Sequence, residues 1–296
     1  MLKRIDTHRH LGGSVPESFF DVLKLGPVFH NDYRYGPDAE HTFEYFFSRF
    51  KCLDEIDWTE SKIELMLDHV SDKINSERYK TILSFSCDKY LSVYRSYTNA
   101  VFNVADYILE KSQNIKLLLG VKYENVKNDF DKIMDAIESS SVTDVISGID
   151  FIGDERQFHK PLVERLLAAM RGKYRRAHVA ERQPNFVGIQ LLKDNLIDGV
   201  AHGIHLGQFD EFFPLIKDRH IFIDMALTSN LKTGTIRDIS KHPIYNFMNN
   251  GCLVTIGTDD PEILDITLDS EFEKVSGLDW DQRLIDNGNE LWNRYN

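Results

Sequence analysis

The 296-residue sequence has few cysteines and no long apolar run, and each deficit excludes a class of protein. Its three cysteines, Cys52, Cys87 and Cys252, form no Cys-x-x-Cys pair, which argues against a disulfide framework and against a cysteine-based zinc site. No stretch reaches the roughly 18–20 consecutive apolar residues that a membrane-spanning helix requires. The first residues contain no apolar signal-peptide core. We therefore expect a cytoplasmic protein that does not bind membranes.

Basic residues are also scarce relative to acidic ones. The chain has 35 Lys and Arg against 47 Asp and Glu, and its formal net charge of −12 includes no basic block. Nucleic-acid phosphates and anionic lipids attract basic patches, so this balance disfavours a nucleic-acid polymer as partner. It favours a small-molecule substrate. The sequence does not indicate an oligomeric state.

Short β-rich runs alternate with longer stretches in which apolar residues recur at helical spacing. We expect strands near residues 2–8, 80–87, 115–121, 145–151, 175–179, 198–202, 220–224 and 252–258, and helices over 102–112, 129–139, 160–171, 186–195 and 238–250. Parallel strands joined by helices give an α/β fold, and eight such units predict a single (β/α)8 TIM barrel over residues 1–296. Residues 11–79 are too long for a plain connection. We expect them to form a helical insertion after strand 1 that covers one end of the barrel.

Histidine and aspartate residues stand at the carboxyl ends of several expected strands, where a TIM barrel builds its active site. Alternation along the first strand puts His8 and His10 on the same side. His178 ends the fifth strand, His202 ends the sixth, and Asp259 follows the eighth. His8, His10, His178 and Asp259 together offer three nitrogen donors and one carboxylate, a set that suits zinc and leaves room for a water. We interpret the remaining histidines as solvent-facing or structural: His30, His41, His69, His159, His205, His220 and His242.

Six motifs follow one another along the chain. They are His8-Arg9-His10-Leu11-Gly12-Gly13-Ser14, Gly148-Ile149-Asp150-Phe151-Ile152-Gly153-Asp154-Glu155, Ala177-His178-Val179-Ala180-Glu181, Ala201-His202-Gly203, Thr228-Ser229-Asn230 and Gly257-Thr258-Asp259-Asp260-Pro261. With these motifs in this order, the sequence resembles the adenosine deaminase family of the amidohydrolase superfamily over most of its length. The resemblance implies one Zn²⁺ per chain, bound by the four residues proposed above. It also implies hydrolytic removal of the 6-amino group of an adenine nucleoside or nucleotide, with release of ammonia.

The resemblance further implies a role for each remaining site residue. Glu181 would donate a proton to ring N1, and His202 would orient and stabilise the zinc-bound hydroxide. Asp259 would be catalytic as well as a ligand. Asp260 would hydrogen-bond ring N7, and the Gly153 amide would meet N3. From the aromatic segment 43–50, Phe46 and Phe47 are expected to cover the substrate, with ordinary helix-core packing as the alternative.

Three positions depart from the family pattern. Ala180 replaces a glycine before the proton-donating glutamate, and Gly257 replaces a common asparagine. Gly12 replaces the aspartate that binds the ribose 5′-hydroxyl in many adenosine deaminases, which predicts tolerance of 5′-modified substrates. The alternative is that another side chain takes over the hydroxyl contact. A 5′-phosphate would require a cation, and the candidates are Arg156, Lys160, Lys232 and Arg237.

Two other interpretations stay open. The chain could be a different amidohydrolase, acting on another cyclic amine or on an N6-substituted adenine. A binuclear enzyme is disfavoured, because the fourth strand ends in Gly148-Ile149-Asp150-Phe151 without the metal-bridging lysine of binuclear relatives. The chain could also be a catalytically dead barrel that serves as a binding module, although Glu181 and His202 argue against this. Metal analysis tests these interpretations: one zinc per chain supports the deaminase, two support a binuclear enzyme, and none supports the dead barrel.

Overall fold

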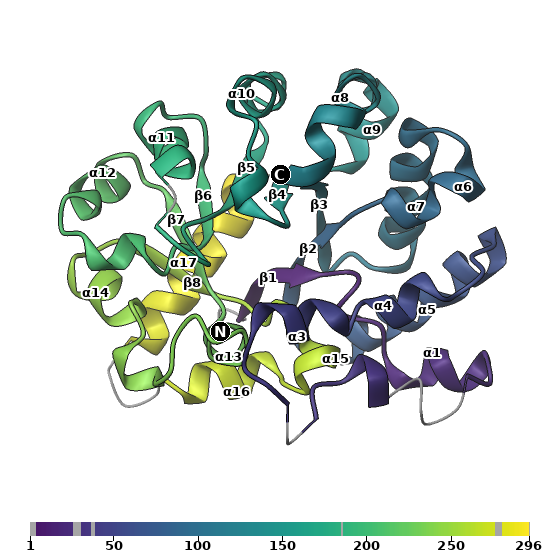
Figure 1. The fold of residues 1–296 in the computed structure, drawn as a ribbon, viewed down its shortest axis with the longest axis horizontal. Helices are drawn as coiled ribbons and strands as arrows, with labels where there is room; N and C mark the ends of the chain where they lie inside the picture. Colours follow the sequence, from purple (N-terminus) through teal and green to yellow (C-terminus); the bar gives the residue numbers. More distant parts are fainter. Residues whose placement is uncertain (1–3, 26–30, 37–38, 185, 276–279, 296) are drawn as a thin grey trace.

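Eight short strands run parallel to one another and lie side by side in chain order, as Figure 1 shows. The strands are β1 (Ile5–His10), β2 (Lys80–Phe85), β3 (Ile115–Lys122), β4 (Gly148–Ile152), β5 (Tyr174–Val179), β6 (Gly199–His202), β7 (Phe222–Met225) and β8 (Leu253–Ile256). The computed structural model describes residues 4–25, 31–36, 39–184, 186–275 and 280–295. Each strand lies within a few residues of its expected position. Residues 2–3 of the expected first strand lie outside the described residues.

The sheet closes between its first and last strands. Arg9 pairs in parallel with Asp259, just beyond β8. The His10 amide donates a hydrogen bond to the Asp259 carbonyl at 2.8 Å, and the Asp259 amide donates to the His8 carbonyl at 2.7 Å. These bonds join the carboxyl end of β1 to the segment that follows β8. The predicted (β/α)8 TIM barrel is confirmed.

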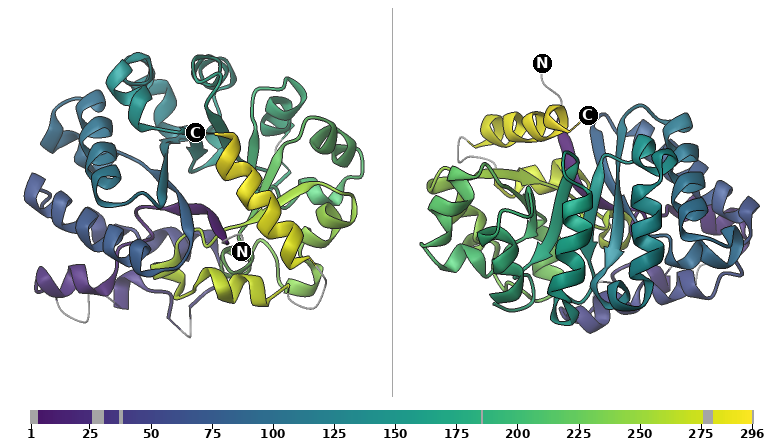
Figure 2. Two further views of the ribbon diagram at one scale, coloured as in Figure 1. Left: turned by 180° about the vertical axis from the view of Figure 1, so that it is seen from behind. Right: turned by 90° about the horizontal axis from the view of Figure 1, so that it is seen from above.

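Helices form a ring around the barrel (Figures 1 and 2). The longer helices are α5 (Glu60–Ser76), α7 (Tyr97–Lys111), α8 (Tyr123–Glu138), α10 (Lys160–Ala169), α11 (Phe186–Lys193), α12 (Phe212–Asp218) and α17 (Asp281–Arg294). The shorter helices are α1 (Glu17–Val22), α3 (Phe43–Ser48), α4 (Lys51–Asp54), α6 (Leu91–Tyr94), α9 (Ser140–Val145), α13 (Leu227–Lys232), α14 (Ile244–Asn249), α15 (Pro261–Leu264) and α16 (Leu268–Glu273), with 3₁₀ turns η1 (Asp88–Tyr90), η2 (Glu155–Gln157), η3 (Leu206–Gln208) and η4 (Ile239–Lys241). Helices α1, α3, α4 and α5 all lie between β1 and β2.

The expected helix over 238–250 is wrong in part. The structure has η4, then a break, then α14. His242 is extended, with φ −63° and ψ 136°. Proline disfavours a helical conformation in the residue before it, so Pro243 ends the first segment and begins the second. The periodic spacing of apolar residues alone does not predict this break in the helix.

Inward-facing residues along β5 trace the barrel interior from its base to its carboxyl end. Tyr174, near the base, packs in an apolar cluster with Phe222 and with Trp292 of α17, the helix that lies across this end of the barrel (Figure 2). Arg176, two residues further along, is fully buried and bonds Asp150 at 2.7 Å and Asp224 at 3.1 Å. Because side chains alternate along a strand, the next inward residue is His178. The buried ion network of Arg176, Asp150 and Asp224 therefore lies between the apolar cluster at the base of the barrel and His178 at its carboxyl end.

Among the described residues, no helix is both long and apolar enough to cross a lipid bilayer. The three cysteines are free and buried.

Candidate metal centre and active site

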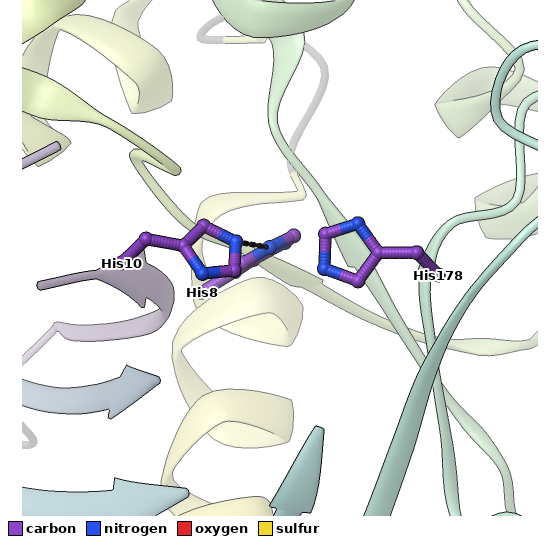
Figure 3. Close-up of side chains that lie close together, drawn as sticks. All are labelled: His8, His10 and His178. Carbon is purple, nitrogen blue, oxygen red and sulfur yellow. Dashed lines mark hydrogen bonds between the residues drawn. The ribbon is translucent and has the colours of Figure 1, made fainter. Parts of the chain in front are cut away.

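Three histidines from opposite sides of the barrel converge at its carboxyl end (Figure 3). His8 and His10 come from β1, and their Nε2 atoms lie 3.0 Å apart. The His178 ring, from β5, faces them with its centroid 5.0 Å from that of His8. Each of the three offers a nitrogen within 4.8 Å of those of the other two. The strand alternation expected from the sequence thus brings these three side chains together.

Asp259, the fourth predicted ligand, lies beside two of these histidines. Its Oδ1 lies 3.2 Å from His10 Nε2 and 3.6 Å from His8 Nε2. The barrel closure described above fixes its backbone against β1. Gly257 is needed for this approach, because a Cβ atom there would lie 2.4 Å from the Cβ of His8. The departure from asparagine at this position therefore has a steric reason in this chain.

The donor set fits a zinc ion. Nδ1 of His8 and Nε2 of His178 are buried, and within the described part of the chain neither makes a hydrogen bond. Buried polar atoms are normally hydrogen-bonded, so orphaned imidazole nitrogens in one cluster indicate a missing partner. Three imidazoles and a carboxylate are a donor mix that suits zinc. His202 lies close enough to His8 and Asp259 to form a further possible group, so its exclusion from the ligand set stays a prediction.

Glu181 lies beside this cluster and is buried. Its Oε2 is 3.7 Å from His178 Nδ1, and its Oε1 is 3.6 Å from His202 Nε2. The Glu155 carboxylate accepts hydrogen bonds from the amides on either side of Glu181, those of Ala180 at 2.7 Å and Arg182 at 2.9 Å. Glu155 belongs to the second motif but was assigned no role from the sequence. It fixes the loop that presents Glu181.

Carboxylates raise the basicity of His178. Burial lowers its pKa, but the negative charge of the Asp150 and Glu181 carboxylates, 3.8 Å and 3.7 Å from its ring nitrogens, outweighs this and raises the pKa to about 10. Although burial opposes it, the neighbouring His10 and His202 hold the pKa of Asp259 well below its ordinary value. Both shifts favour charge pairing between imidazoles and carboxylates in this cluster.

The pKa of Asp260 is shifted in the opposite direction from that of Asp259. Burial and the adjacent Asp259 carboxylate raise the pKa of Asp260 well above its ordinary value, which favours a neutral, proton-donating carboxyl group. Its Oδ1 is another buried atom without a hydrogen-bond partner in the described chain. A Cβ atom at Gly13 would overlap Asp260 Oδ1 at 1.8 Å. The glycine of the first motif therefore makes room for this carboxyl group.

Three site residues have strained backbones. Ala180, His202 and Asp259 have φ of 53°, 62° and 62°, in the left-handed region that non-glycine residues seldom adopt. Ala180 directly follows β5, His202 ends β6, and Asp259 lies three residues after the end of β8. Strain of this kind costs of order 1–3 kcal/mol per residue and clusters at functional sites. At Ala180, a glycine would adopt the same conformation without that cost.

A pocket of about 290 Å³ opens over the cluster. The predicted site residues that line it are His10, Gly12, Phe46, Phe47, Gly153, His178, Glu181, His202, Asp259 and Asp260. His8 lies beneath the pocket wall and is fully buried. Phe46 is only 5% exposed, whereas Phe47 is 44% exposed. All the predicted residues are therefore gathered at one end of the barrel.

Sequence reasoning missed the pocket's lysines. Lys89 and Lys122 line the pocket, together with Glu124, Ser84 and Ser86. Lys122 ends β3 and the two serines lie at the end of β2. The expectation that site residues stand at the carboxyl ends of strands could therefore have found these three residues. Lys89 pairs with Asp54 at 2.6 Å, and Lys122 pairs with Asp88 at 3.1 Å.

The four cations proposed from the sequence do not line this pocket: Arg156, Lys160, Lys232 and Arg237. Arg156 and Lys160 instead pair with nearby carboxylates at the surface. Of the histidines interpreted as structural or solvent-facing, His30 lies outside the described residues. His242 is buried and hydrogen-bonded to Asn230.

A family model described as "Adenosine deaminase" matches residues 112–287. An aminodeoxyfutalosine deaminase of Acidothermus cellulolyticus is 37% identical over 86 residues, which are 29% of this chain and only 24% of that protein. An adenosine deaminase of Shewanella pealeana is 24% identical over 290 residues, covering 92% of this chain and 87% of that protein.

Solved structures show the same fold. An adenine deaminase of Arthrobacter aurescens superposes with a TM-score of 0.78 at 16% identity, covering 99% of this chain and all of that one. Arabidopsis ADAL complexed with IMP superposes with a TM-score of 0.74 at 19% identity, covering 93% of this chain and 85% of that one.

Proposed function

Because the chain belongs to the adenosine deaminase family, we propose that it is a zinc-dependent hydrolase that removes the 6-amino group of an adenine nucleoside or nucleotide and releases ammonia. The observation that carries this proposal is the cluster of His8, His10 and His178, with Asp259 beside two of them and Glu181 beside the third, under one pocket. These four residues would hold the ion, one per chain. Zinc lowers the pKa of a bound water to about 7 and so supplies a nucleophile at neutral pH.

The chain's own residues would activate and orient the purine. Glu181, buried beside His178 and His202, would donate a proton to ring N1 and make C6 electrophilic. Asp260, which lines the pocket and has a buried Oδ1 without a hydrogen-bond partner in the described chain, would hydrogen-bond N7. The Gly153 amide would donate to N3. The turn at Gly153 has φ 86°, and a Cβ there would lie 2.5 Å from a Glu124 oxygen, so a side chain is excluded at this point of the pocket.

We also propose that the enzyme tolerates changes at the ribose 5′ position. Gly12 lines the pocket and presents no side chain to accept a hydrogen bond from a 5′-hydroxyl. A Cβ atom at Gly12 would meet only the Phe50 ring, at 3.5 Å, which is an ordinary contact. A Cβ atom is therefore sterically tolerated here, and contacts with its neighbours do not require a glycine. If the substrate carries a phosphate, Lys89 and Lys122 replace the cations expected from the sequence, because they line the pocket.

A substrate panel tests both proposals. Adenosine, 5′-deoxyadenosine, AMP, adenine and N6-methyl-AMP would be assayed by ammonia release, and zinc would be counted per chain. A site built around a hydroxyl contact rejects analogues lacking it by about 10⁴–10⁵-fold. We expect much weaker discrimination, and Gly12→Asp should shift preference towards adenosine. A wild-type preference for adenosine above about 10³-fold over both 5′ analogues contradicts tolerance. Absence of ammonia from every adenine compound contradicts the deaminase proposal.

The lysines are tested in the same assay. Lys89→Met should lower kcat/KM for AMP by at least tenfold while leaving that for adenosine nearly unchanged, since a phosphate in a partly closed pocket needs a charge-assisted partner. Lys232→Met is the matched control, because Lys232 does not line the pocket. Equal loss on both substrates would remove Lys89 from phosphate recognition.

A further inference from the structure

Three buried side chains form a hydrogen-bonded chain that leads from α14 to the pocket. His242 Nε2 lies 3.1 Å from Asn230 Oδ1, and Asn230 Nδ2 lies 3.0 Å from His202 Nδ1. All three residues are at most 1% exposed. His242 precedes α14, Asn230 lies in α13 and His202 ends β6. The chain therefore connects the backbone of α14 to a residue of the proposed active site.

The direction of these hydrogen bonds is set at the far end, by the Ile244 amide. This amide donates to His242 Nδ1 at 3.1 Å. It lies in the first turn of α14, where helix amides have no partner within the helix. A backbone N–H can only donate, so His242 Nδ1 must carry a lone pair. With a lone pair on Nδ1, the ring carries its one proton on Nε2. Burial lowers the pKa of His242 to about 3, in agreement with a neutral ring.

The proton on His242 Nε2 in turn fixes the orientation of the Asn230 side chain. His242 Nε2–H is a donor, so the Asn230 atom facing it must be the carbonyl oxygen. The Asn230 amide group then faces His202, and because an amide nitrogen can only donate, His202 Nδ1 must accept. This sequence of constraints fixes the orientation of the Asn230 amide without depending on an assignment of its oxygen and nitrogen.

We propose that His242 and Asn230 are positioning residues that lock neutral His202 in the tautomer with its proton on Nε2. That nitrogen is on the pocket side of the ring, 3.6 Å from Glu181 Oε1 and 4.0 Å from Asp259 Oδ2. In this tautomer His202 donates a hydrogen bond to an oxygen in the site and has no lone pair there to accept a proton. The tautomer follows from geometry alone. Its consequence for catalysis rests on the proposed function.

We refer to the hydrogen-bonded chain from His242 through Asn230 to His202 as the relay. It is tested by observing the tautomer of His202 directly. Zinc-loaded protein with ¹⁵N-labelled histidine would be examined by long-range ¹H–¹⁵N correlation, which distinguishes protonated from unprotonated ring nitrogens, with His202 assigned by its loss in His202→Gln. We expect protonated Nε2 and unprotonated Nδ1 for His202 in the wild type. Asn230→Asp is close in shape but offers only acceptors to both rings. It should place a proton on His202 Nδ1 and lower kcat by about 10²-fold or more with little change in KM.

Two variants of His242 form a matched pair. His242→Gln keeps an acceptor for the Ile244 amide and a donor for Asn230, so it should retain the wild-type tautomer and most of the rate. His242→Leu has neither the acceptor nor the donor, so it should give mixed His202 tautomers and a lower kcat. Zinc content and melting temperature would be compared for the two variants.

Protonated Nδ1 in wild-type His202, or unchanged His202 signals in both Asn230→Asp and His242→Leu, would overturn the relay. A protonated Nε2 in a protein that deaminates no adenine compound would support the relay and refute the proposed function.

Discussion

Glu181 is the residue on which turnover should depend most strongly. Its carboxyl group lies between His178 and His202, and Glu155 fixes the loop on both sides of it. Glu181→Gln should keep zinc but lower kcat by about 10²–10⁴-fold, because an amide does not donate a proton as an acid does. Steady-state kinetics and metal analysis of the same preparation measure this. Activity within about threefold of wild type would remove Glu181 from proton transfer.

Zinc content should separate ligands from neighbours. His8→Ala and Asp259→Ala each remove a proposed donor and should lose both zinc and activity. His202→Ala should lose rate but retain most of its zinc, because the proposed role of His202 is to donate a hydrogen bond from Nε2. Metal analysis after dialysis against zinc-free buffer tests this. Equal zinc loss in all three variants would make His202 a ligand.

His242 should make the protein sensitive to acid. Its folded pKa of about 3 lies below the ordinary value of 6.5, so the unfolded chain binds the proton more readily. Stability from this group is therefore complete above pH 6.5 and lost as pH falls towards 3, by at most about 1.4 kcal/mol per pH unit. Urea unfolding of wild type and His242→Gln at pH 7.0 and 5.0 measures the difference. The variant should lose less stability, and equal losses would contradict the assignment.

At the scale of elements, α3 lines the pocket with Phe43, Phe46 and Phe47. Thr42 caps it by accepting a hydrogen bond from the Tyr45 amide at 3.2 Å. Arg182 connects it to the Glu181 loop, since its guanidinium lies 4.3 Å from the centre of the Phe43 ring and bonds Glu44 at 2.9 Å. Helix α3 is therefore attached to the segment that presents the proposed proton donor.

The two phenylalanines expected to cover the substrate should behave differently. Phe47 lines the pocket and is 44% exposed, so Phe47→Ala should raise KM several-fold with little change in melting temperature. Phe46 also lines the pocket but is 5% exposed, so Phe46→Ala should additionally destabilise the fold by about 3–5 kcal/mol.

Kinetics and thermal unfolding of both variants test this. A lower melting temperature for Phe47→Ala without a rise in KM would favour ordinary helix packing.

At the scale of the whole molecule, the metal ligands connect segments far apart in sequence. His8 and His10 lie in β1, His178 lies in β5, and Asp259 lies at the closing seam between β8 and β1. A ligand that binds only the folded state stabilises it by about 2.7 kcal/mol at a hundred times its Kd. Chelation should therefore lower the melting temperature, and added zinc should restore it. His8→Ala is the control and should not respond to chelator. An equal response in both proteins would place the stabilising metal elsewhere.

The sequence alone determined the barrel and the predicted ligand set. Both depend on local patterns: alternation within β1 puts His8 and His10 on one side, and polar residues directly after buried runs mark strand ends such as His178 and Asp259. Parallel strands of a barrel end on the same face, so these local patterns were sufficient to predict one site. The structure brings those residues together as the patterns indicate.

Only the tertiary structure decided which other groups face the site. Lys89 and Lys122 line the pocket while Arg156 and Lys232 do not, although all four belong to segments near strand ends. A side chain's direction depends on the segment packed against it, and sequence spacing does not contain that information. His242 shows the same limit, because it lies 40 residues from His202 and is connected to it by hydrogen bonds through Asn230. Hydrogen bonds between distant segments form only when the chain is folded, so the structure alone reveals them.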